Sequence, residues 1–330
     1  MNTKILFLPL YSEEWASSKY RVYNHLRHFK KFDLTCKVLT PPAPKLLSRI
    51  QYYIKLFTYL LWCDVVFIQK KIFRLQIFNA ILIFRKKIIF DFDDAIYCYD
   101  DVHNDLKYIL KHVNLVIVAD ENLAIYALKF NHNVQVIPTP VELQDSPNEY
   151  RNKKKDSIHV GWIGRSWNQH YLAELEDVFD FLYYSLRLDI KLLIMSGEPF
   201  SFKNSVFPVV NVPWGQETEN EFMRNIDIGL VPLNDDEWSR GKCGYKVLLH
   251  MSYGIPVIVS PVGVKKEIIV HGINGYFAET KNDWIESIEN LAKDPALRLK
   301  IGECGYDKVK REYTYKSISS QLANILRNVR

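Results

Sequence analysis

Short apolar runs alternate with amphipathic segments along most of the chain. Runs of four to six apolar residues bounded by Pro, Asn or Gly are typical of strands buried on both faces of a parallel sheet. The first half therefore predicts strands at Ile5–Leu8, Leu34–Leu39, Asp64–Gln69, Ile88–Phe92, Leu115–Ala119 and Val134–Ile137. The second half predicts strands at Ile158–Ile163, Lys191–Met195, Val209–Val212, Ile228–Leu233 and Pro256–Val259. Segments with helical spacing fill the intervals, as expected for an α/β protein.

A polar stretch without periodicity, ELQDSPNEYRNKKKD at 142–156, divides these two series. The whole chain has 330 residues, which is long for one hydrophobic core and comfortable for two. We therefore predict two doubly wound domains, at residues 1–148 and 157–312, joined by a linker at 149–156.

Two places in the second half have the composition of an anion site. The polar segment Asn234–Gly244 holds two glycines and runs into a helix predicted at Tyr245–Tyr253, with Lys242 and Lys246 beside it. Gly164 and Arg165 follow the strand Ile158–Ile163 in the same way. Backbone N–H groups at a helix N-terminus bind anions, and the cations add the matching charge.

The first of these regions also resembles a known family. The run KCGYKVLLHMSYGIPVIVSPVGVKKEIIVHGINGYF is similar to the donor-binding half of retaining glycosyltransferases of the GT-B type, family 4. The fixed spacings that carry this resemblance join Lys246, Met251, Gly254, Pro256, Val257, Val262, Gly263, Glu267, Gly272, Asn274 and Gly275. The resemblance implies two Rossmann-like domains facing a central cleft, with a C-terminal helix at 313–330 that packs back on the first domain.

The resemblance also implies roles for particular residues. Arg165 and Lys246 would neutralise the diphosphate that leaves a nucleotide-diphosphate sugar. The residues expected to bind this donor are Gly164, Arg165, Lys242, Cys243, Gly244, Lys246, Val262, Gly263 and Glu267.

One departure from the family pattern concerns a pair of acidic residues with seven residues between them. Gly241 and Leu249 occupy these positions here. The acidic run at 235–237, or backbone N–H groups of 241–244, could take over the hydroxyl contacts, so the base and sugar of the donor stay open.

Three carboxylates, Asp91, Asp93 and Asp94, lie at or just after the end of the strand Ile88–Phe92 in the first half. Crowded carboxylates suit proton transfer. The family commonly has a His here, and we expect Asp93 or Asp94 to contact the reacting sugar or the acceptor hydroxyl. The alternative is that they cap a helix or pair with basic neighbours. A carboxylate acting as a base would allow inversion of the anomeric centre in place of retention.

Arg21 follows the first strand in the stretch SSKYR, which loosely fits a Ser-x-Arg pattern of the family. Either it contacts the donor or acceptor, or it is a surface charge. No pattern supplies a third ligand beside the carboxylates, so we expect neither a metal nor a cofactor.

Positive charge is concentrated at the N-terminal end. Residues 1–90 hold 16 Lys and Arg against 4 Asp and Glu, whereas the whole chain has a net charge of only +5. The segment Lys45–Lys87 is basic, apolar and rich in aromatic residues. Such helices can lie on an anionic membrane surface, although Lys side chains can also extend past helices that pack on a sheet. Nucleic acid is not expected, because no recognition motif accompanies the charge.

Five cysteines without CxxC spacing, and no secretory signal or long uncharged apolar run, favour a cytoplasmic protein. Together with the resemblance, this leads us to expect a metal-independent, retaining hexosyltransferase, peripheral on the inner face of the membrane. Its acceptor would be a glycan or lipid-linked glycan of cell-surface polysaccharide synthesis. The alternatives are a sugar-nucleotide epimerase, or a catalytically weak homologue that binds a sugar nucleotide or a membrane partner.

Overall fold

The structure, a computed structural model, describes residues 2–99, 103–145 and 156–329. The chain forms two compact units. Unit 1 comprises Met1–Pro140, Arg240–Cys243 and Tyr313–Arg330, and unit 2 comprises Val141–Ser239 and Gly244–Glu312. Most of the linker predicted at 149–156 lies outside the described residues.

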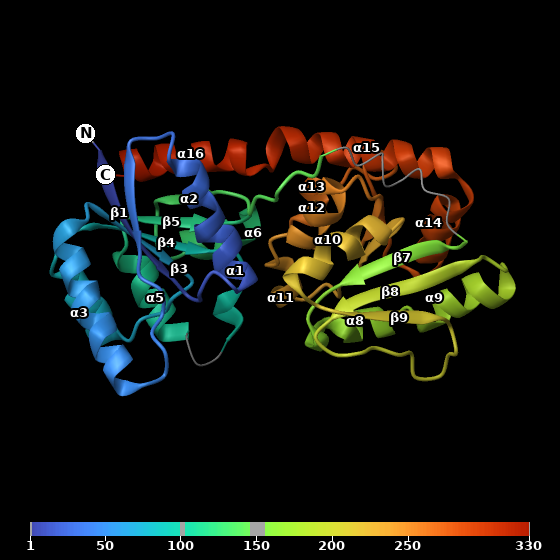
Figure 1. The fold of residues 1–330 in the computed structure, drawn as a ribbon, viewed down its shortest axis with the longest axis horizontal. Helices are drawn as coiled ribbons and strands as arrows, with labels where there is room; N and C mark the ends of the chain where they lie inside the picture. The colour runs from blue at the N-terminus through green and yellow to red at the C-terminus, as the bar shows by residue number, and fades with distance from the viewer. Residues whose placement is uncertain (1, 100–102, 146–155, 330) are drawn as a thin grey trace. The chain divides into compact units, whose positions relative to one another are not determined.

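Unit 1 is built on a parallel sheet of six strands, drawn in blue to green in Figure 1. The strand order is β2-β1-β3-β4-β5-β6, so the chain winds outward from β1 to both edges. The strands are β1 (Thr3–Pro9), β2 (Leu34–Val38), β3 (Val65–Gln69), β4 (Lys87–Phe92), β5 (Leu115–Val118) and β6 (Val134–Val136).

Helices cover both faces of this sheet because its central strands are apolar on both sides. Ile5, Phe7 and Phe67 face a core that includes α2 (Asn24–Phe29) and the C-terminal helix α16 (Tyr315–Asn328). The remaining long helices of unit 1 are α3 (Leu46–Trp62), α4 (Leu75–Leu82), α5 (His103–His112) and α6 (Glu121–Leu128).

The first helical segment is irregular. A short α1 (Ala16–Ser18) continues through a π-helical turn at Lys19–Tyr23 into α2. Serine is a common N-cap residue, but neither Ser17 nor Ser18 is the N-cap of this helix. Trp15 is the N-cap residue, and the Ser18 hydroxyl lies inside the helix, where it donates to Gln69.

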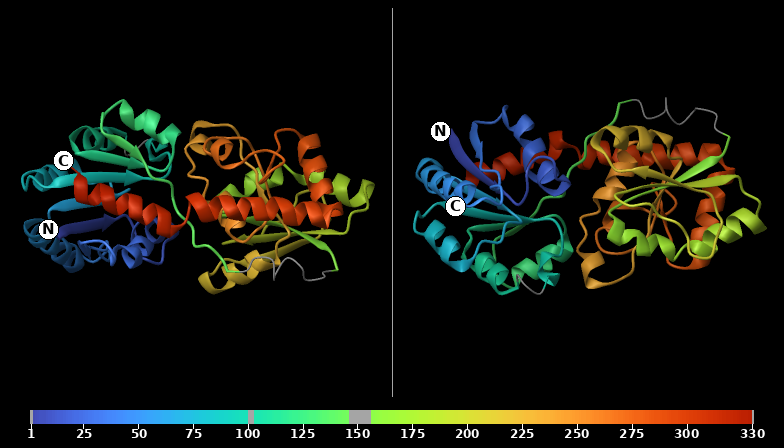
Figure 2. Two further views of the ribbon diagram at one scale, coloured as in Figure 1. Left: turned by 90° about the horizontal axis from the view of Figure 1, so that it is seen from above. Right: turned by 60° about the horizontal axis from the view of Figure 1, so that its bottom comes forward.

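Unit 2 repeats the architecture with a second parallel six-stranded sheet in the order β12-β11-β10-β7-β8-β9. Its strands are β7 (Ile158–Ile163), β8 (Ile190–Ser196), β9 (Val209–Pro213), β10 (Ile228–Val231), β11 (Val257–Val259) and β12 (Tyr276–Phe277). The two views in Figure 2 show the strands of this sheet between helical layers.

Each face of the second sheet has its own core. One face packs on α8 (Gln169–Ala173), α9 (Glu176–Asp180) and α14 (Lys281–Lys293), with Trp162 and Trp284 buried between them. The other face packs on α10 (Gln216–Asn225) and α12 (Tyr245–Ser252). The shorter α11 (Glu237–Arg240) and α13 (Lys265–Ile268) flank α12 in the chain, and α15 (Pro295–Glu312) packs along it.

The predicted fold class, two doubly wound α/β units of the GT-B type, is confirmed by these sheets and by the structural likeness reported below. Every predicted strand is present, with boundaries shifted by one or two residues. The interval between β7 and β8 does not hold one continuous helix, because its helical segment breaks into α8, α9 and a π-helical turn at Phe181–Ser185. Sequence reasoning missed the short helix α11.

Candidate active site

Each sheet has a point where its strand order reverses. In unit 1, β1 lies between β2 and β3, and in unit 2, β7 lies between β8 and β10. Connections on either side of such a strand leave for opposite faces of the sheet, so a crevice opens at the carboxyl ends of the strands. The loops that matter are therefore those after β1 and β3 in unit 1, and after β7 and β10 in unit 2.

In unit 2, Lys246 and Gly164 meet at this point. A Cβ atom added to Gly164 would lie 2.7 Å from the Lys246 Nζ atom and 2.4 Å from the Trp162 ring. The Lys246 ammonium also lies 4.9 Å from the centroid of that buried ring. The loop after β7 is anchored by the Gly164 N–H, which donates to the Met195 carbonyl over 3.0 Å. A side chain at this position would meet both the buried Trp162 ring and the Lys246 ammonium, so at least one of them would have to move.

Arg165 supplies another cation in the same loop. It follows Gly164 directly, is solvent-exposed, and places its guanidinium 4.8 Å from the Trp167 ring centroid. The structure therefore brings together two of the predicted donor-binding residues, Gly164 and Lys246, and Arg165 is next to Gly164 in the chain.

Helix α12 begins in a conformation that only glycine adopts easily. Its N-cap Gly244 has φ +71°, and an added Cβ would lie 2.7 Å from Ile268 and 3.0 Å from Val264. The start of α12 is therefore packed directly against α13. Because Val262, Gly263 and Glu267 belong to the same turn and helix, these predicted residues lie close to Gly244; Val262 is buried and Glu267 exposed.

Lys242 and Cys243 are placed differently. They belong to the short segment 240–243 that groups with unit 1, although Gly244 groups with unit 2. Within this segment a Cβ on Gly241 would lie 2.5 Å from the Ala95 Cβ, so its backbone runs directly against the residue that follows Asp94.

The structure shows what occupies one of the two positions where the family has an acidic residue. Leu249 is 7% exposed and belongs to the core between the sheet and α12. Of the acidic residues that could stand in for the pair, Asp236 is engaged in capping, since its carboxylate accepts the Ser239 N–H over 2.7 Å at the start of α11.

In unit 1, the three carboxylates separate into two groups. Asp91 is fully buried and forms a two-point ion pair with Arg21, whose guanidinium also donates to the Ile137 carbonyl over 2.7 Å. Although burial lowers the pKa of Arg21, the neighbouring Asp91 carboxylate outweighs it and raises that pKa, so the arginine stays charged. Arg21 is 2% exposed, and the expectation of a surface charge is therefore wrong.

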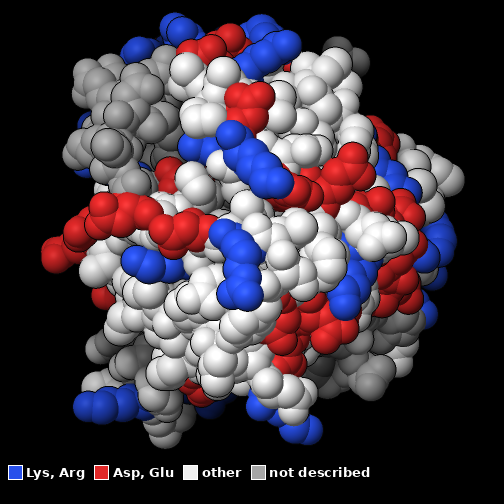
Figure 3. Space-filling model, turned by 90° about the vertical axis from the view of Figure 1, so that its right-hand side faces the viewer, with Lys and Arg blue, Asp and Glu red and all other residues white. Residues whose placement is uncertain are grey.

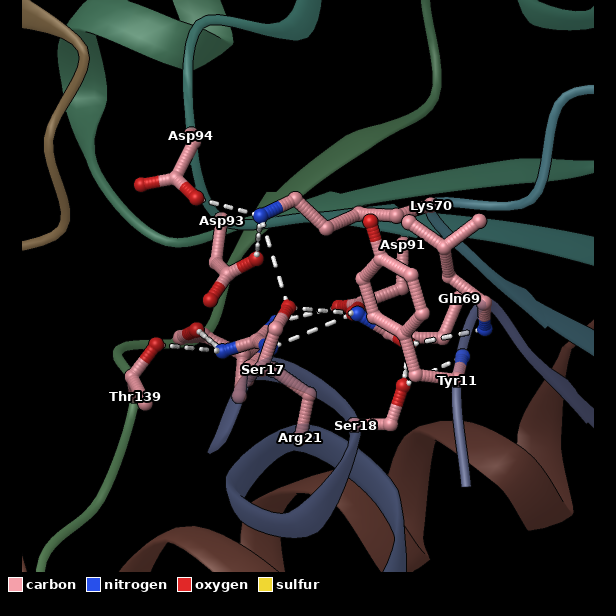
Figure 4. A network of polar contacts seen from close by, with 12 residues as sticks. Tyr11, Ser17, Ser18, Arg21, Gln69, Lys70, Asp91, Asp93, Asp94 and Thr139 are labelled. Atoms are coloured by element: carbon pink, nitrogen blue, oxygen red, sulfur yellow. Dashed lines mark hydrogen bonds and ion pairs between the residues drawn. The ribbon is translucent and has the colours of Figure 1, made fainter. Parts of the chain in front are cut away.

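Asp93 and Asp94 share one buried lysine, Lys70, as Figure 4 shows. The Lys70 Nζ atom lies 2.8 Å from Asp93 and also bonds Asp94. Burial lowers the pKa of Lys70, but both carboxylates act against this and raise it overall. The Asp93 side chain is 6% exposed and that of Asp94 is 32% exposed. Only Asp94 therefore combines this charge network with an open approach.

Sequence reasoning missed Lys70, although a signal was present. Lys70 directly follows the predicted strand Asp64–Gln69. Strands β3 and β4 are neighbours, and their carboxyl ends lie at the same edge of the sheet. Lys70 has φ +53°, a conformation that costs a lysine energy and persists when its surroundings demand it. In the described part of the chain, no group of three or more His, Cys, Asp or Glu is arranged to hold a metal ion.

One sequence comparison concerns the second half of the chain. Residues 157–294 match the model of the family described as "Glycosyl transferases group 1", and the match covers most of unit 2. The fold is that of the GT-B glycosyltransferases, as the sequence predicted.

The particular relatives are distant. The sucrose-phosphate synthase of Thermosynechococcus elongatus superposes with a TM-score of 0.72 at 14% identity, covering 98% of each chain. HepE of Anabaena, solved with UDP and glucose, gives a TM-score of 0.70 at 14% identity, covering 98% of this chain and 99% of that one. At such identity the likeness establishes the fold.

Among curated proteins, sucrose synthase 1 of Tulipa gesneriana is 28% identical over 88 residues. This alignment covers 25% of the present chain and 11% of the tulip protein, so it reaches only a small part of that relative.

Proposed function

We propose that this protein transfers a sugar from a nucleoside diphosphate donor to a hydroxyl group of a glycan or lipid-linked acceptor in cell-surface polysaccharide synthesis. The observation that carries the proposal is the Lys246 ammonium held over Gly164, where the sheet of unit 2 reverses its strand order. Arg165 stands next to it, and the start of α12 supplies backbone N–H groups. This is a site for a diphosphate. HepE, which shares the fold, was solved with UDP-glucose, and we propose a UDP-sugar as the donor.

The proposed reaction breaks the bond between the anomeric carbon of the sugar and the diphosphate oxygen. Negative charge then grows on the departing diphosphate, and Lys246 and Arg165 stabilise it more strongly in the transition state than in the bound donor. The acceptor oxygen forms the new bond to the anomeric carbon, and its proton passes to the leaving phosphate in a retaining reaction. Two cations and a helix N-terminus allow this without a metal ion.

Replacement of the lysine tests the proposal. Lys246→Ala is expected to lower kcat/KM for transfer by about 30- to 1,000-fold, which corresponds to about 2–4 kcal/mol. Lys300→Ala, which changes an exposed lysine on α15, is the matched control and should leave transfer unchanged. Transfer by Lys246→Ala within about threefold of the wild type would refute the proposed leaving-group role.

Substitution of Asp94 distinguishes two stereochemical outcomes of the proposed transfer, retention and inversion. If the reaction retains configuration, Asp94→Asn should lower the rate without changing the anomer of the product. If Asp94 removes the acceptor proton, the wild-type product should have inverted configuration, and Asp94→Asn should abolish its formation. The anomeric coupling constant in the proton NMR spectrum of the product separates the two cases, and activity in EDTA tests metal independence.

The absence of the acidic pair favours a second candidate function. With Leu249 in the core, the protein lacks one carboxylate expected to hold the ribose hydroxyls. A binding protein of low activity would bind UDP in a calorimetric titration but produce no transfer with any acceptor. Calorimetry and product analysis on the same sample therefore distinguish the two functions.

We also propose that unit 1 rests on an anionic membrane through α3. Large apolar side chains recur on one side of this helix and are exposed: Leu46 (74%), Leu47 (66%), Ile50 (48%), Ile54 (61%) and Leu61 (74%). The opposite side, with Tyr52, Leu56 and Leu60, is buried against the unit. Phe57 stacks on Phe84 at 5.9 Å between centroids, which brings the exposed Ile83 beside this surface.

The positive charge of the surrounding segment favours an anionic partner for this surface. Residues 45–87 contain nine Lys and Arg and a single acidic residue, Asp64. By contrast, Figure 3 looks onto unit 2 and shows Lys and Arg interleaved with Asp and Glu. Apolar side chains inserted among anionic headgroups, with cations beside them, are the means by which such helices bind. In the described parts of the chain no helix is long and apolar enough to cross a membrane.

Vesicle sedimentation tests this contact. The wild type should bind vesicles containing phosphatidylglycerol, bind neutral phosphatidylcholine vesicles more weakly, and dissociate as salt is raised. Ile50→Ser/Ile54→Ser should weaken binding at least about tenfold, since two inserted side chains contribute about 1–3 kcal/mol. Ile125→Ser, an equally exposed isoleucine on α6, is the control. Equal binding by both variants would exclude α3 as the membrane contact.

A further inference from the structure

The loop after β1 carries a pair of exposed aromatic rings. Tyr11 and Trp15 stack with centroids 5.1 Å apart and ring planes 26° from parallel. Tyr11 is 39% and Trp15 47% exposed, whereas Phe7, on the preceding strand, is 1% exposed. Two stacked rings that could have been buried are left facing solvent, and a surface of this kind marks a place where a ligand or partner binds.

This pair lies where the fold of unit 1 offers a ligand crevice. The loop follows β1, the strand on which the order of the sheet reverses, and Lys70 follows the neighbouring β3. Loops that diverge at this point form the binding crevice of open α/β sheets.

The aromatic loop is held in place by hydrogen bonds. The Tyr11 N–H donates to the Ser18 hydroxyl over 3.0 Å, and that hydroxyl donates to the Gln69 side-chain oxygen over 2.8 Å. The Leu10 N–H donates to the same oxygen over 3.2 Å. Gln69 is fully buried, so the rings stand on a rigid support and little freedom is lost when a ligand binds.

The same network leads to an accessible carboxylate, as Figure 4 shows. The Gln69 amide donates to the Ser17 hydroxyl over 3.1 Å, and Lys70 donates to it over 3.4 Å. Lys70 in turn holds Asp94, which is 32% exposed. An aromatic surface and an ionised carboxylate are therefore fixed by one set of buried side chains.

We propose that Tyr11, Trp15 and Asp94 form the subsite for a neutral sugar ring of the acceptor. This inference rests on the proposed glycosyltransferase function. One face of a pyranose presents C–H groups that pack on the negative face of aromatic rings, and its hydroxyl groups donate to a carboxylate. Exposed Glu13 and Glu14 lie between the two aromatic residues, and their charge disfavours a phosphate or another anion at this place.

Saturation-transfer NMR on the full-length protein tests the subsite directly. The probes are the methyl glycosides of glucose, galactose, mannose and N-acetylglucosamine, with glycerol phosphate as an anionic comparison. They are used at about 50 mM, above the millimolar dissociation constants expected for one sugar ring. The wild type should saturate the ring C–H protons of at least one glycoside and not those of glycerol phosphate.

Substitutions test which residues form the subsite. Trp15→Ala and Asp94→Asn should each weaken glycoside binding at least about tenfold, the effect of losing a stacking surface or a charge-assisted hydrogen bond. Trp15→Phe should restore most of the binding, and Tyr184→Ala, an exposed aromatic residue of unit 2, should not affect it. UDP binding should be the same in all of them. Wild-type protein that binds none of the four glycosides, or Trp15→Ala that binds them normally, overturns the proposal.

The two proposals fail separately. Loss of glycoside binding with normal UDP binding concerns only this subsite. A wild-type protein that does not bind UDP refutes the glycosyltransferase function, whatever the glycosides do.

Discussion

At the scale of single residues, Lys70 has the largest structural role outside the core. It neutralises two carboxylates at the end of β4 from a left-handed backbone conformation. A buried ion pair adds little stability compared with an apolar replacement, but removing one partner leaves an uncompensated buried charge. The cluster therefore holds Asp94 in position at some cost in backbone strain.

Lys70→Met is expected to lower the free energy of unfolding by about 3–5 kcal/mol, because Asp93 loses its cation in a buried place. Urea denaturation measures this effect. Lys111→Met, an exposed lysine on α5, should change stability by less than about 0.5 kcal/mol. The double variant Lys70→Met/Asp93→Asn should recover part of the loss, and failure to recover any would contradict the electrostatic explanation.

His25 should make the stability of unit 1 depend on pH. Burial lowers its pKa well below 6.5, and Arg21 and His28 act in the same direction. As the pH falls through about 6.5, His25 therefore binds a proton in the unfolded chain but not in the folded chain. Stability is complete above about pH 6.5 and falls with decreasing pH by up to about 1.4 kcal/mol per pH unit.

Denaturation of the wild type and His25→Gln at pH 7.5 and 5.5 tests this dependence. Gln still reaches the Ser319 hydroxyl, which lies 2.8 Å from His25, but does not titrate. The variant should lose less stability at pH 5.5 than the wild type, and His112→Gln on the surface should behave like the wild type. Identical pH profiles for all three proteins would rule out His25 as the source.

At the scale of elements, the strands could be predicted from short runs of apolar residues. These runs arise because both faces of each strand are buried, and they can be recognised without knowing which strands pair. The short polar helix α11 lacks such a pattern and was not predicted. In the site, the segment from Gly244 to Glu267 was found because its residues are close in sequence. The Lys70–Asp94 contact was not, because it joins the ends of β3 and β4, which only the folded sheet brings together.

The turn after β7 provides a prediction at this scale. Gly164→Ala should weaken UDP binding at least about tenfold, because its Cβ would lie 2.7 Å from the Lys246 ammonium and force it away. Gly197→Ala, at the end of β8, is the matched control: its Cβ would lie 3.4 Å from the Ser166 hydroxyl, an ordinary contact. Calorimetric titration with UDP should separate the two variants, and equal affinities would show that the turn tolerates a side chain.

At the scale of the whole molecule, the two units differ in how their cores are assembled. Unit 1 depends on α16, whose Ile318, Leu322 and Leu326 belong to its core and whose Tyr315 accepts a bond from Asn24. Unit 2 is complete without any residue after Glu312.

Truncation after Glu312 should therefore destabilise unit 1 selectively. We expect the truncated protein to unfold in two thermal transitions, with unit 1 at the lower temperature, while UDP still raises the second transition. Calorimetry with and without UDP measures both transitions. A single transition at the temperature of the full-length protein would mean that α16 contributes nothing to the core of unit 1.

The place of α16 in unit 1 has a consequence for biosynthesis. The first 140 residues leave the ribosome early, yet the helix that covers one face of their sheet is translated only after the whole of unit 2. At about 5–20 residues per second, the nascent unit waits roughly 10–35 s with that apolar face uncovered. During this interval it is a natural client for chaperones, and stop codons near the 3′ end of the message should trap it in that state.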